Sequence, residues 1–289
     1  MSARIIDGKA IAAEIRQEIT ADVGYLKVKH RVVPGLAAVL VGDDPASQVY
    51  VRTKRKACRE VGIYSAEHRL PTSTSEGELI ALLKRLNEDN RIHGILLQSP
   101  LPFPLKEERM FEMISPMKDA DGFHPENVGR LLIGEPRFVP CTPYGVQQML
   151  IRSGIPIEGR DVVIVGRSNI VGKPLAALLM QKASWANATV TICHTGTRNL
   201  AEQTRRAEIL IAAAGRPRMI TAEMVSEGVV VIDVGTNRID GKLVGDVEFE
   251  GVAEKASAIA PVPGGVGPMT VTMLLYNTVR AARMAYHLE

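Results

Sequence analysis

Residues 161–174, DVVIVGRSNIVGKP, decide the fold of this chain. An apolar run over 161–166 ends in Gly166, and Gly172 follows six residues later, where a helix can begin. A glycine permits a tight turn after a strand, and backbone N–H groups at a helix start can bind a phosphate. The spacing departs from GxGxxG, so an ordinary strand–helix turn and a dinucleotide-binding turn both fit these residues.

Further apolar runs follow the turn, separated by segments of helical spacing. Continuous apolar strands that alternate with helices are typical of a parallel sheet covered on both faces. The second half of the chain is therefore predicted to be a doubly wound, Rossmann-like sheet, which favours the dinucleotide interpretation of the turn. A hairpin turn is predicted at Asp240-Gly241. The four predicted strands of this sheet are 161–166, 189–193, 208–213 and 229–234.

The first half of the chain shows the same alternation, with apolar runs over 35–41 and 92–98. A proline-rich stretch, 136–143, separates the halves, and a long apolar helix over 269–287 could return to the first domain. We therefore predict an α/β protein of two domains with a cleft between them. The predicted N-terminal α/β domain comprises 1–139 plus 268–289, and the dinucleotide-binding domain comprises 140–267.

Composition limits the classes of function. The 289 residues are 46% apolar and 23% charged, which is typical of a globular protein. A formal charge of +3 is too small to indicate a nucleic-acid or membrane partner. Three widely spaced cysteines argue against a disulfide framework and a cysteine metal site. With no recognisable signal peptide and no apolar run of about 18 residues, we expect a cytoplasmic protein.

The choice between NAD and NADP depends on the residues after the second strand of the Rossmann-like sheet. NAD sites usually carry an acidic residue there, which binds the ribose 2′-hydroxyl. This chain has Cys193-His194-Thr195 without an acid, and Arg167 could bind a 2′-phosphate by charge-assisted hydrogen bonds. The pattern favours NADP, although Arg167 could equally be a solvated loop residue.

A predicted helix over 45–61 places Lys54 on an apolar stripe together with Tyr50, Ala57, Cys58 and Val61. A desolvated ammonium loses proton affinity, so Lys54 could act as a general base. It could instead extend past the edge of the core or pair with a carboxylate.

Three other stretches stand where a ligand could bind. Gln98 ends a buried strand, and ligands of open α/β sheets bind beyond the carboxyl ends of strands. Its amide could position a water or a substrate, or could instead hydrogen-bond the nearby loop backbone. The acids of 118–123, KDADGF, suit substrate hydrogen bonding or a turn better than a metal. The glycines of 261–268, PVPGGVGP, would let backbone approach a flat ligand, or would form an irregular interdomain connection.

Together and in this order, the motifs resemble one family, the bifunctional methylenetetrahydrofolate dehydrogenase/methenyltetrahydrofolate cyclohydrolases of the bacterial FolD type. The resemblance covers nearly the whole chain. The matching stretches are SQVYVRTKRKACREVGI (47–63), GILLQSPLP (94–102), KDADGFHPENVGRL (118–131), PCTPYGV (140–146), VVIVGRSNIVGKP (162–174), VVIDVGTN (230–237) and PVPGGVGPMTVTMLL (261–275).

The resemblance implies a role for each candidate site residue. Lys54 resembles the catalytic lysine, Gln98 the residue that hydrogen-bonds it, and Asp121 the acid that holds the pterin. Tyr50 would stack on the folate, and the loop of Pro263, Gly264 and Gly265 would close over it. The residues implied to bind the cofactor are Gly166, Arg167, Ser168, Gly172, Thr195 and Thr236.

The resemblance also implies the chemistry. Hydride would pass from the methylene carbon between N5 and N10 of the folate to NADP⁺. Water would then add to the methenyl cation and give 10-formyltetrahydrofolate, without a metal. A homodimer is implied by the family alone. The alternatives are another two-domain NADP-dependent dehydrogenase, such as a shikimate-dehydrogenase-like enzyme, and a redox-sensing binding protein without catalysis.

The chain departs from the family pattern at a few positions. Thr195 and Gly196 stand where the family often has serine followed by a basic residue, which weakens the NADP preference unless Arg167 suffices. Thr236 replaces the usual isoleucine, and residues 183–188 lengthen one helix-to-strand connection.

Overall fold

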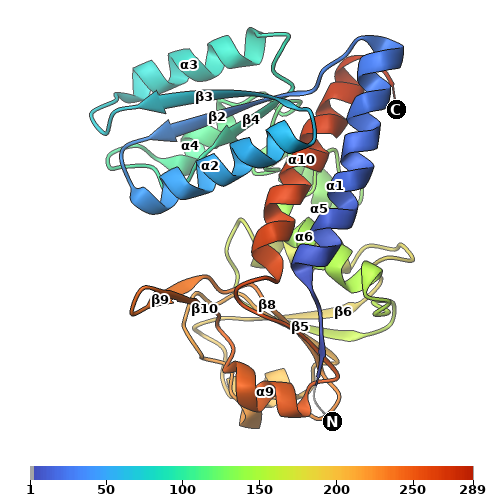
Figure 1. Cartoon of the computed structure of the whole chain (residues 1–289). Coiled ribbons are helices and arrows are strands. Elements are labelled where there is room, and N and C mark those ends of the chain that lie inside the picture. Colours follow the sequence, from blue (N-terminus) through green and yellow to red (C-terminus); the bar gives the residue numbers. More distant parts are fainter. Residues whose placement is uncertain (1–2, 289) are drawn as a thin grey trace. The chain divides into compact units, whose positions relative to one another are not determined.

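The computed structural model describes residues 3–288, which divide into two compact units. One unit comprises the residues up to Ala13 together with Thr142–Thr270, and the other comprises Glu14–Cys141 together with the residues from Val271 onward. Each unit contains its own parallel sheet with helices (Figure 1). We call them the six-stranded unit and the three-stranded unit. The architecture confirms the predicted two-domain α/β class.

The six-stranded unit has the strand order β1-β11-β8-β7-β5-β6, and every neighbouring pair is parallel. All four predicted strands are present, with ends that shift by no more than one residue. Two short strands, β11 and β1, extend the sheet beyond the prediction, and β1 forms its edge. The strands are β1 (Arg4–Ile5), β5 (Asp161–Val165), β6 (Thr189–Cys193), β7 (Ile209–Ala212), β8 (Val230–Asp233) and β11 (Ala258–Ala260).

Short helices connect these strands, and alternate residues of the strands form one buried core, among them Val163, Leu210, Val231 and Ile259. The predicted hairpin is confirmed, because β9 (Asn237–Ile239) pairs antiparallel with β10 (Lys242–Val244). Asp240 and Gly241 at its turn both have positive φ. The helices are α6 (Cys141–Arg152), α7 (Gly172–Leu179), α8 (Leu200–Arg205), the 3₁₀ turn η2 (Ala222–Met224) and α9 (Phe249–Lys255).

The three-stranded unit has the parallel order β3-β2-β4. One face of α3 carries Leu79, Leu82, Leu83 and Leu86, all buried against β2 and β4 as the spacing predicted. The sequence YSAEHRL of β3 mixes polar and apolar residues, so its pattern did not predict a strand. The elements are β2 (Gly35–Val41), α2 (Pro45–Glu60), β3 (Tyr64–Leu70), α3 (Glu76–Glu88), β4 (Gly94–Leu97), α4 (Glu107–Glu112) and α5 (Pro125–Leu132).

The division into units falls inside two long helices, α1 (Gly8–Tyr25) and α10 (Val266–Ala285). A π-helical turn, η1 (Leu26–His30), follows α1. The helix α10 begins at Val266, so the expectation that 261–268 lacks regular structure was wrong for its last residues. An added Cβ on Gly267 would meet no neighbour, so packing does not require a glycine at this position of the helix.

The unit boundaries differ from the predicted 1–139 at the start of the chain. The strand β1 pairs in parallel with β11, and Ile6 N–H donates to Ile259 O at 2.9 Å. A two-residue strand has no measurable periodicity, so only this pairing places the first residues with the six-stranded unit.

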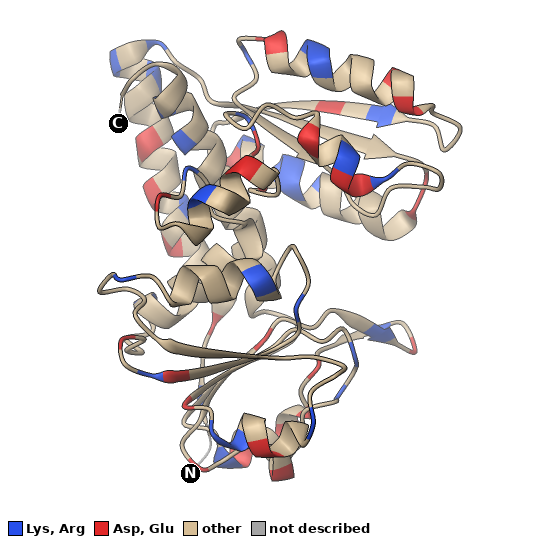
Figure 2. Ribbon diagram, turned by 180° about the vertical axis from the view of Figure 1, so that it is seen from behind, with Lys and Arg blue, Asp and Glu red and all other residues tan. Residues whose placement is uncertain are grey.

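Charged residues are distributed along the helices and loops, with acidic and basic positions interspersed in each unit (Figure 2). Among the described residues, no helix combines the length and apolarity needed to cross a membrane.

Candidate functional site

Two sets of predicted site residues come together, one in each unit. The three-stranded unit holds Tyr50, Lys54, Gln98 and Asp121. The six-stranded unit holds the glycine turn after β5, the loop ends after β6 and β8, and residues 263–265.

Helix α2 positions Lys54. The helix begins directly after β2, and the Asp44 side chain caps it by accepting from Ser47 N–H at 2.7 Å. Exposure increases along the predicted stripe, from the buried Ala57 and Cys58 to Tyr50, which is 45% exposed. Lys54 is partly buried at the transition, so its ammonium lies at the edge of the core.

Gln98 holds the Lys54 ammonium. Lys54 Nζ donates to Gln98 Oε1 at 3.1 Å. The amide nitrogen of Gln98 donates to the backbone oxygen of Ser99 at 2.7 Å, which leaves the oxygen as the end that faces Lys54. Backbone pairing with Val39 O at 2.9 Å fixes Gln98 at the end of β4. The side chain is only 9% exposed, so its surroundings restrict this orientation.

The two acids of 118–123 have different surroundings. Asp119 is buried, and its carboxylate accepts from the backbone N–H groups of Gly122, Phe123 and His124. It therefore shapes the turn. Burial raises the pKa of Asp121 to about 6, the positive charge of Lys54 opposes that rise, and Asp119 adds to it. Because the charge of Lys54 affects the pKa of Asp121, the two side chains belong to the same site.

The turn after β5 accepts only glycine at two positions. Gly166 has a φ of +137°, and an added Cβ would lie 2.0 Å from Ala213 O. A Cβ on Gly172 would lie 2.1 Å from Gly166 O. The turn is closed on itself at the start of α7, where Val171 N–H donates to Ser168 Oγ at 3.1 Å. A Cβ at either glycine would occupy the space inside this turn. With both glycines present, the turn can hold a pyrophosphate at the start of the helix.

The remaining cofactor candidates lie at the same sheet edge. In the strand order, β5 connects to β6 on one side, whereas its other neighbour, β7, connects to β8 on the opposite side. Ligands of open α/β sheets bind at such a switch point, which here lies between β5 and β7. Arg167, Ser168, Thr195 and Thr236 are all exposed. Each follows the carboxyl end of a strand, and these ends meet at one edge because the strands are parallel.

Sequence reasoning missed Asp233 and Asp246, which organise that edge. The Asp246 carboxylate accepts from the N–H groups of Ala214 and Gly215 at 2.6 and 2.8 Å, in the loop after β7. Asp233 accepts from the N–H groups of Gly235 and Asp246, both at 2.9 Å. Burial raises the pKa of Asp233 to about 6. The sequence did contain a signal for Asp233, because it is an acid at the end of the apolar strand VVID.

The loop that precedes α10 is tightly packed. Gly264 has a φ of +112°, and Gly265 N–H donates to Pro261 O at 2.8 Å. A Cβ on Gly8, at the start of α1, would lie 1.9 Å from Gly265 O. Pro263 is exposed, so the loop offers this proline on its outer side.

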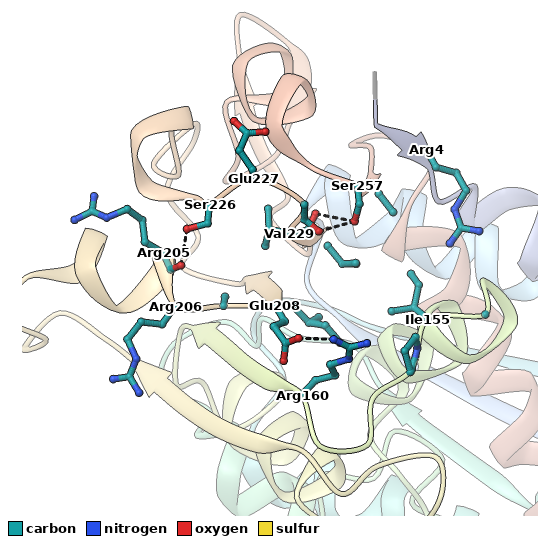
Figure 3. A pocket seen from close by; sticks show the side chains of 17 residues that line it. Arg4, Ile155, Arg160, Arg205, Arg206, Glu208, Ser226, Glu227, Val229 and Ser257 are labelled. Carbon is teal, nitrogen blue, oxygen red and sulfur yellow. Dashed lines mark hydrogen bonds and ion pairs between the residues drawn. The ribbon is translucent and has the colours of Figure 1, made fainter. Parts of the chain in front are cut away.

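A cavity of about 670 Å³ in the six-stranded unit lies away from these residues. It is lined by the amino ends of the strands, including Ile209, Val230 and Ala258, so it lies at the opposite sheet edge from the glycine turn. The ion pair of Arg160 with Glu208 borders it (Figure 3). We assign no catalytic part to this cavity.

Comparisons with known proteins agree along nearly the whole chain. The family model "Tetrahydrofolate dehydrogenase/cyclohydrolase, catalytic domain" matches residues 6–121, and the model for the NAD(P)-binding domain of the same family matches residues 140–286. A Bifunctional protein FolD of Geotalea uraniireducens is 61% identical, covering 97% of this chain and 99% of that protein.

Solved structures show the same likeness. A FolD methylenetetrahydrofolate dehydrogenase/cyclohydrolase of Campylobacter jejuni superposes with a TM-score of 0.94 at 48% identity, covering 98% of this chain and 100% of that one. The dehydrogenase-cyclohydrolase of Trypanosoma brucei, solved with NADP cofactor and inhibitor, gives 0.93 at 39% identity, covering 99% of each chain.

Proposed function

Since the chain belongs to the tetrahydrofolate dehydrogenase/cyclohydrolase family, we propose that it oxidises 5,10-methylenetetrahydrofolate with NADP⁺ and hydrolyses the product to 10-formyltetrahydrofolate. The hydrogen bond from Lys54 to Gln98, beside Asp121, is the observation that carries the proposal. Family membership also decides against the shikimate-dehydrogenase-like alternative, because both family models and the close relatives agree.

The chain's own residues perform defined parts of this chemistry. Gln98 holds Lys54 Nζ in one place. In its neutral form, after the ammonium has released a proton to solvent, the amine can take a proton from the water that attacks the methenyl carbon. Asp121 accepts hydrogen bonds from the pterin and orients the ring. When bound in the cradle of Gly166 and Gly172, NADP⁺ supplies the hydride acceptor.

The direct test mixes the purified chain with methylenetetrahydrofolate and NADP⁺, and separately with NAD⁺, while absorbance follows reduced cofactor and the methenyl product. We expect turnover with NADP⁺ and slower turnover with NAD⁺. Absence of turnover with both cofactors would contradict the proposed function.

The pH dependence of folate binding should report Asp121. Its pKa of about 6 means that the carboxylate is ionised above that pH and protonated below it. Protonation removes an acceptor from the pterin, so KM for methylenetetrahydrofolate should rise about tenfold between pH 7.5 and pH 5. In Asp121→Asn the KM should be high and nearly flat over the same range. A wild-type profile without this inflection would contradict the role of Asp121.

Arg167 should determine the preference for NADP over NAD. Arg167→Ala removes the cation proposed to bind the 2′-phosphate, so the Kd for NADP should rise about tenfold or more while the Kd for NAD stays nearly constant. Lys182→Ala is the control, because Lys182 is exposed beyond the far end of α7. Equal losses for both cofactors would show that Arg167 does not bind the 2′-phosphate.

We further propose that the protein works as a homodimer in the cytoplasm, in one-carbon metabolism that supplies purine and amino-acid biosynthesis. The support for these points is the family resemblance. Light scattering on a size-exclusion column tests the dimer directly, and a monomer at micromolar concentration would contradict it.

A further inference from the structure

The helix α10 carries a buried asparagine for which the proposed chemistry has no use. Asn277 is only 1% exposed, and its helix neighbours Leu274, Leu275 and Val279 are buried as well. A buried amide is unfavourable unless its hydrogen bonds are made. The partners of Asn277 therefore indicate what this polar side chain contributes to an otherwise apolar part of the helix.

The Asn277 amide joins two segments that are far from it in sequence. Its nitrogen donates to Ala120 O at 2.8 Å and to Val139 O at 3.0 Å. Carbonyl oxygens can only accept, so the nitrogen end of the amide must face these two segments. All three residues belong to the three-stranded unit, which also holds Lys54, Gln98 and Asp121.

The two segments that Asn277 joins are closely packed against each other. Gly122 has a φ of +76°, and an added Cβ there would lie 2.8 Å from Pro140 N. Cys141 Sγ donates to Ala120 O at 3.4 Å, and the Asn277 nitrogen lies 3.8 Å from the same sulfur. Ala120 O therefore accepts from both α10 and the start of α6.

These contacts fix the backbone on both sides of Asp121. Ala120 O belongs to the peptide group that precedes Asp121. The N–H of the peptide group that follows it, on Gly122, donates to Asp119 O and to Asp119 Oδ1, both at 3.1 Å. Because peptide groups are planar, a residue between two fixed peptide groups keeps little freedom in φ and ψ. The backbone thus determines where the Asp121 side chain points.

The Asp121 carboxylate also has direct neighbours. A hydrogen bond from the Cys141 thiol and the positive charge of Lys54 both lower the pKa of Asp121, whereas burial and the charge of Asp119 raise it. Asp121 therefore points toward the lysine of the site, and the thiol that contacts Ala120 O contacts its carboxylate too.

We propose that Asn277 is a positioning residue of the folate site. By holding Ala120 O it fixes the peptide group that leads into Asp121, and so keeps the Asp121 carboxylate directed at the pterin. The inference rests on the proposed function through the role of Asp121. Asn277 itself is buried and acts only through that residue.

Two variants test the need for the amide. Asn277→Leu removes the donors and nearly preserves the volume, whereas Asn277→Ala removes the donors and leaves a cavity. Both should raise KM for methylenetetrahydrofolate about tenfold and leave kcat within about twofold, because substrate binding is weakened while Lys54 and Gln98 stay in place. If only packing mattered, the leucine variant would keep the wild-type KM, and that result would overturn the proposal.

A double-mutant cycle tests whether the effect passes through Asp121. In the Asp121→Asn background, Asn277→Leu should raise KM by less than about twofold. The matched control is Thr278→Val, because Thr278 is also buried and its hydroxyl donates only to Leu274 O of its own helix, at 2.8 Å. That variant should keep the KM of its parent in both backgrounds. An equal rise for Asn277→Leu in both backgrounds would overturn the proposal.

A measurement without turnover separates this inference from the proposed function. NMR titration of ¹³C-labelled aspartate carboxyls gives the pKa of Asp121, whose resonance is the one missing from Asp121→Asn. The wild-type pKa of about 6 should fall toward about 4 in Asn277→Leu, as the carboxylate turns to solvent. An unchanged pKa in the folded variant would overturn the proposal, whereas a shifted pKa in an enzyme without turnover would contradict only the proposed function. Thermal melting checks folding, and Asn277→Ala replaces the leucine variant in every arm if that variant does not fold.

Discussion

Replacing Lys54 by methionine is expected to lower the rate of methenyltetrahydrofolate hydrolysis by about a thousandfold. Methionine preserves the apolar stem, so α2 keeps its packing beside the buried Ala57 and Cys58. The substitution removes the nitrogen that Gln98 holds at 3.1 Å, and with it the group that takes the proton from water. The decay of methenyl absorbance in the purified variant measures the effect.

Two controls separate chemistry from folding. Lys56→Met lies on the outer face of the same helix, where the lysine side chain is 80% exposed, and should retain the wild-type rate. NADP binding to Lys54→Met should also be unchanged, because the cofactor candidates belong to the six-stranded unit. Calorimetric titration with NADP measures this binding. Hydrolysis that persists within a few-fold of wild type would remove Lys54 from the proposed mechanism.

Gly166→Ala is expected to destabilise the six-stranded unit by about 3 kcal/mol and to reduce NADP binding severely. The new Cβ would lie 2.0 Å from Ala213 O, so the backbone of the turn or of the loop after β7 must move. Either movement opens the cradle that Gly172 closes. Urea unfolding followed by Trp185 fluorescence measures the stability, and titration with NADP measures the binding.

The matched control for this substitution is Gly154→Ala. Gly154 also has a positive φ, +66°, but an added Cβ meets no neighbour within 4 Å. The variant should therefore lose only about 1 kcal/mol, from backbone strain alone, and should bind NADP normally. If Gly166→Ala behaved like Gly154→Ala, the close approach of Gly166 to Ala213 would not be essential to the cofactor turn.

Much of the fold was predictable because several segments have strong local patterns. The strands β2 and β6 match their predicted ranges residue for residue. In β2, continuous apolar residues bounded by turns specify a buried strand, whereas β6 is a partly exposed edge strand whose β-branched residues favour an extended backbone. The leucine face of α3 was also predictable, because its leucines recur at helical spacing. By contrast, the polar β3 and the two-residue β1 form because neighbouring strands supply their hydrogen bonds, which no local pattern records.

The candidate site divides in a similar way. Its residue types could be recognised along the chain, because Lys54 on an apolar stripe, Gln98 at a strand end and glycines around a turn each have a local signature. The family resemblance implied the pairing of Lys54 with Gln98, and the structure contains that hydrogen bond. The tertiary structure alone decided that Asp246 accepts from the loop after β7. These partners are far apart in sequence. Their contact follows from the parallel order of the strands, which places the ends of separate segments at one edge of each sheet.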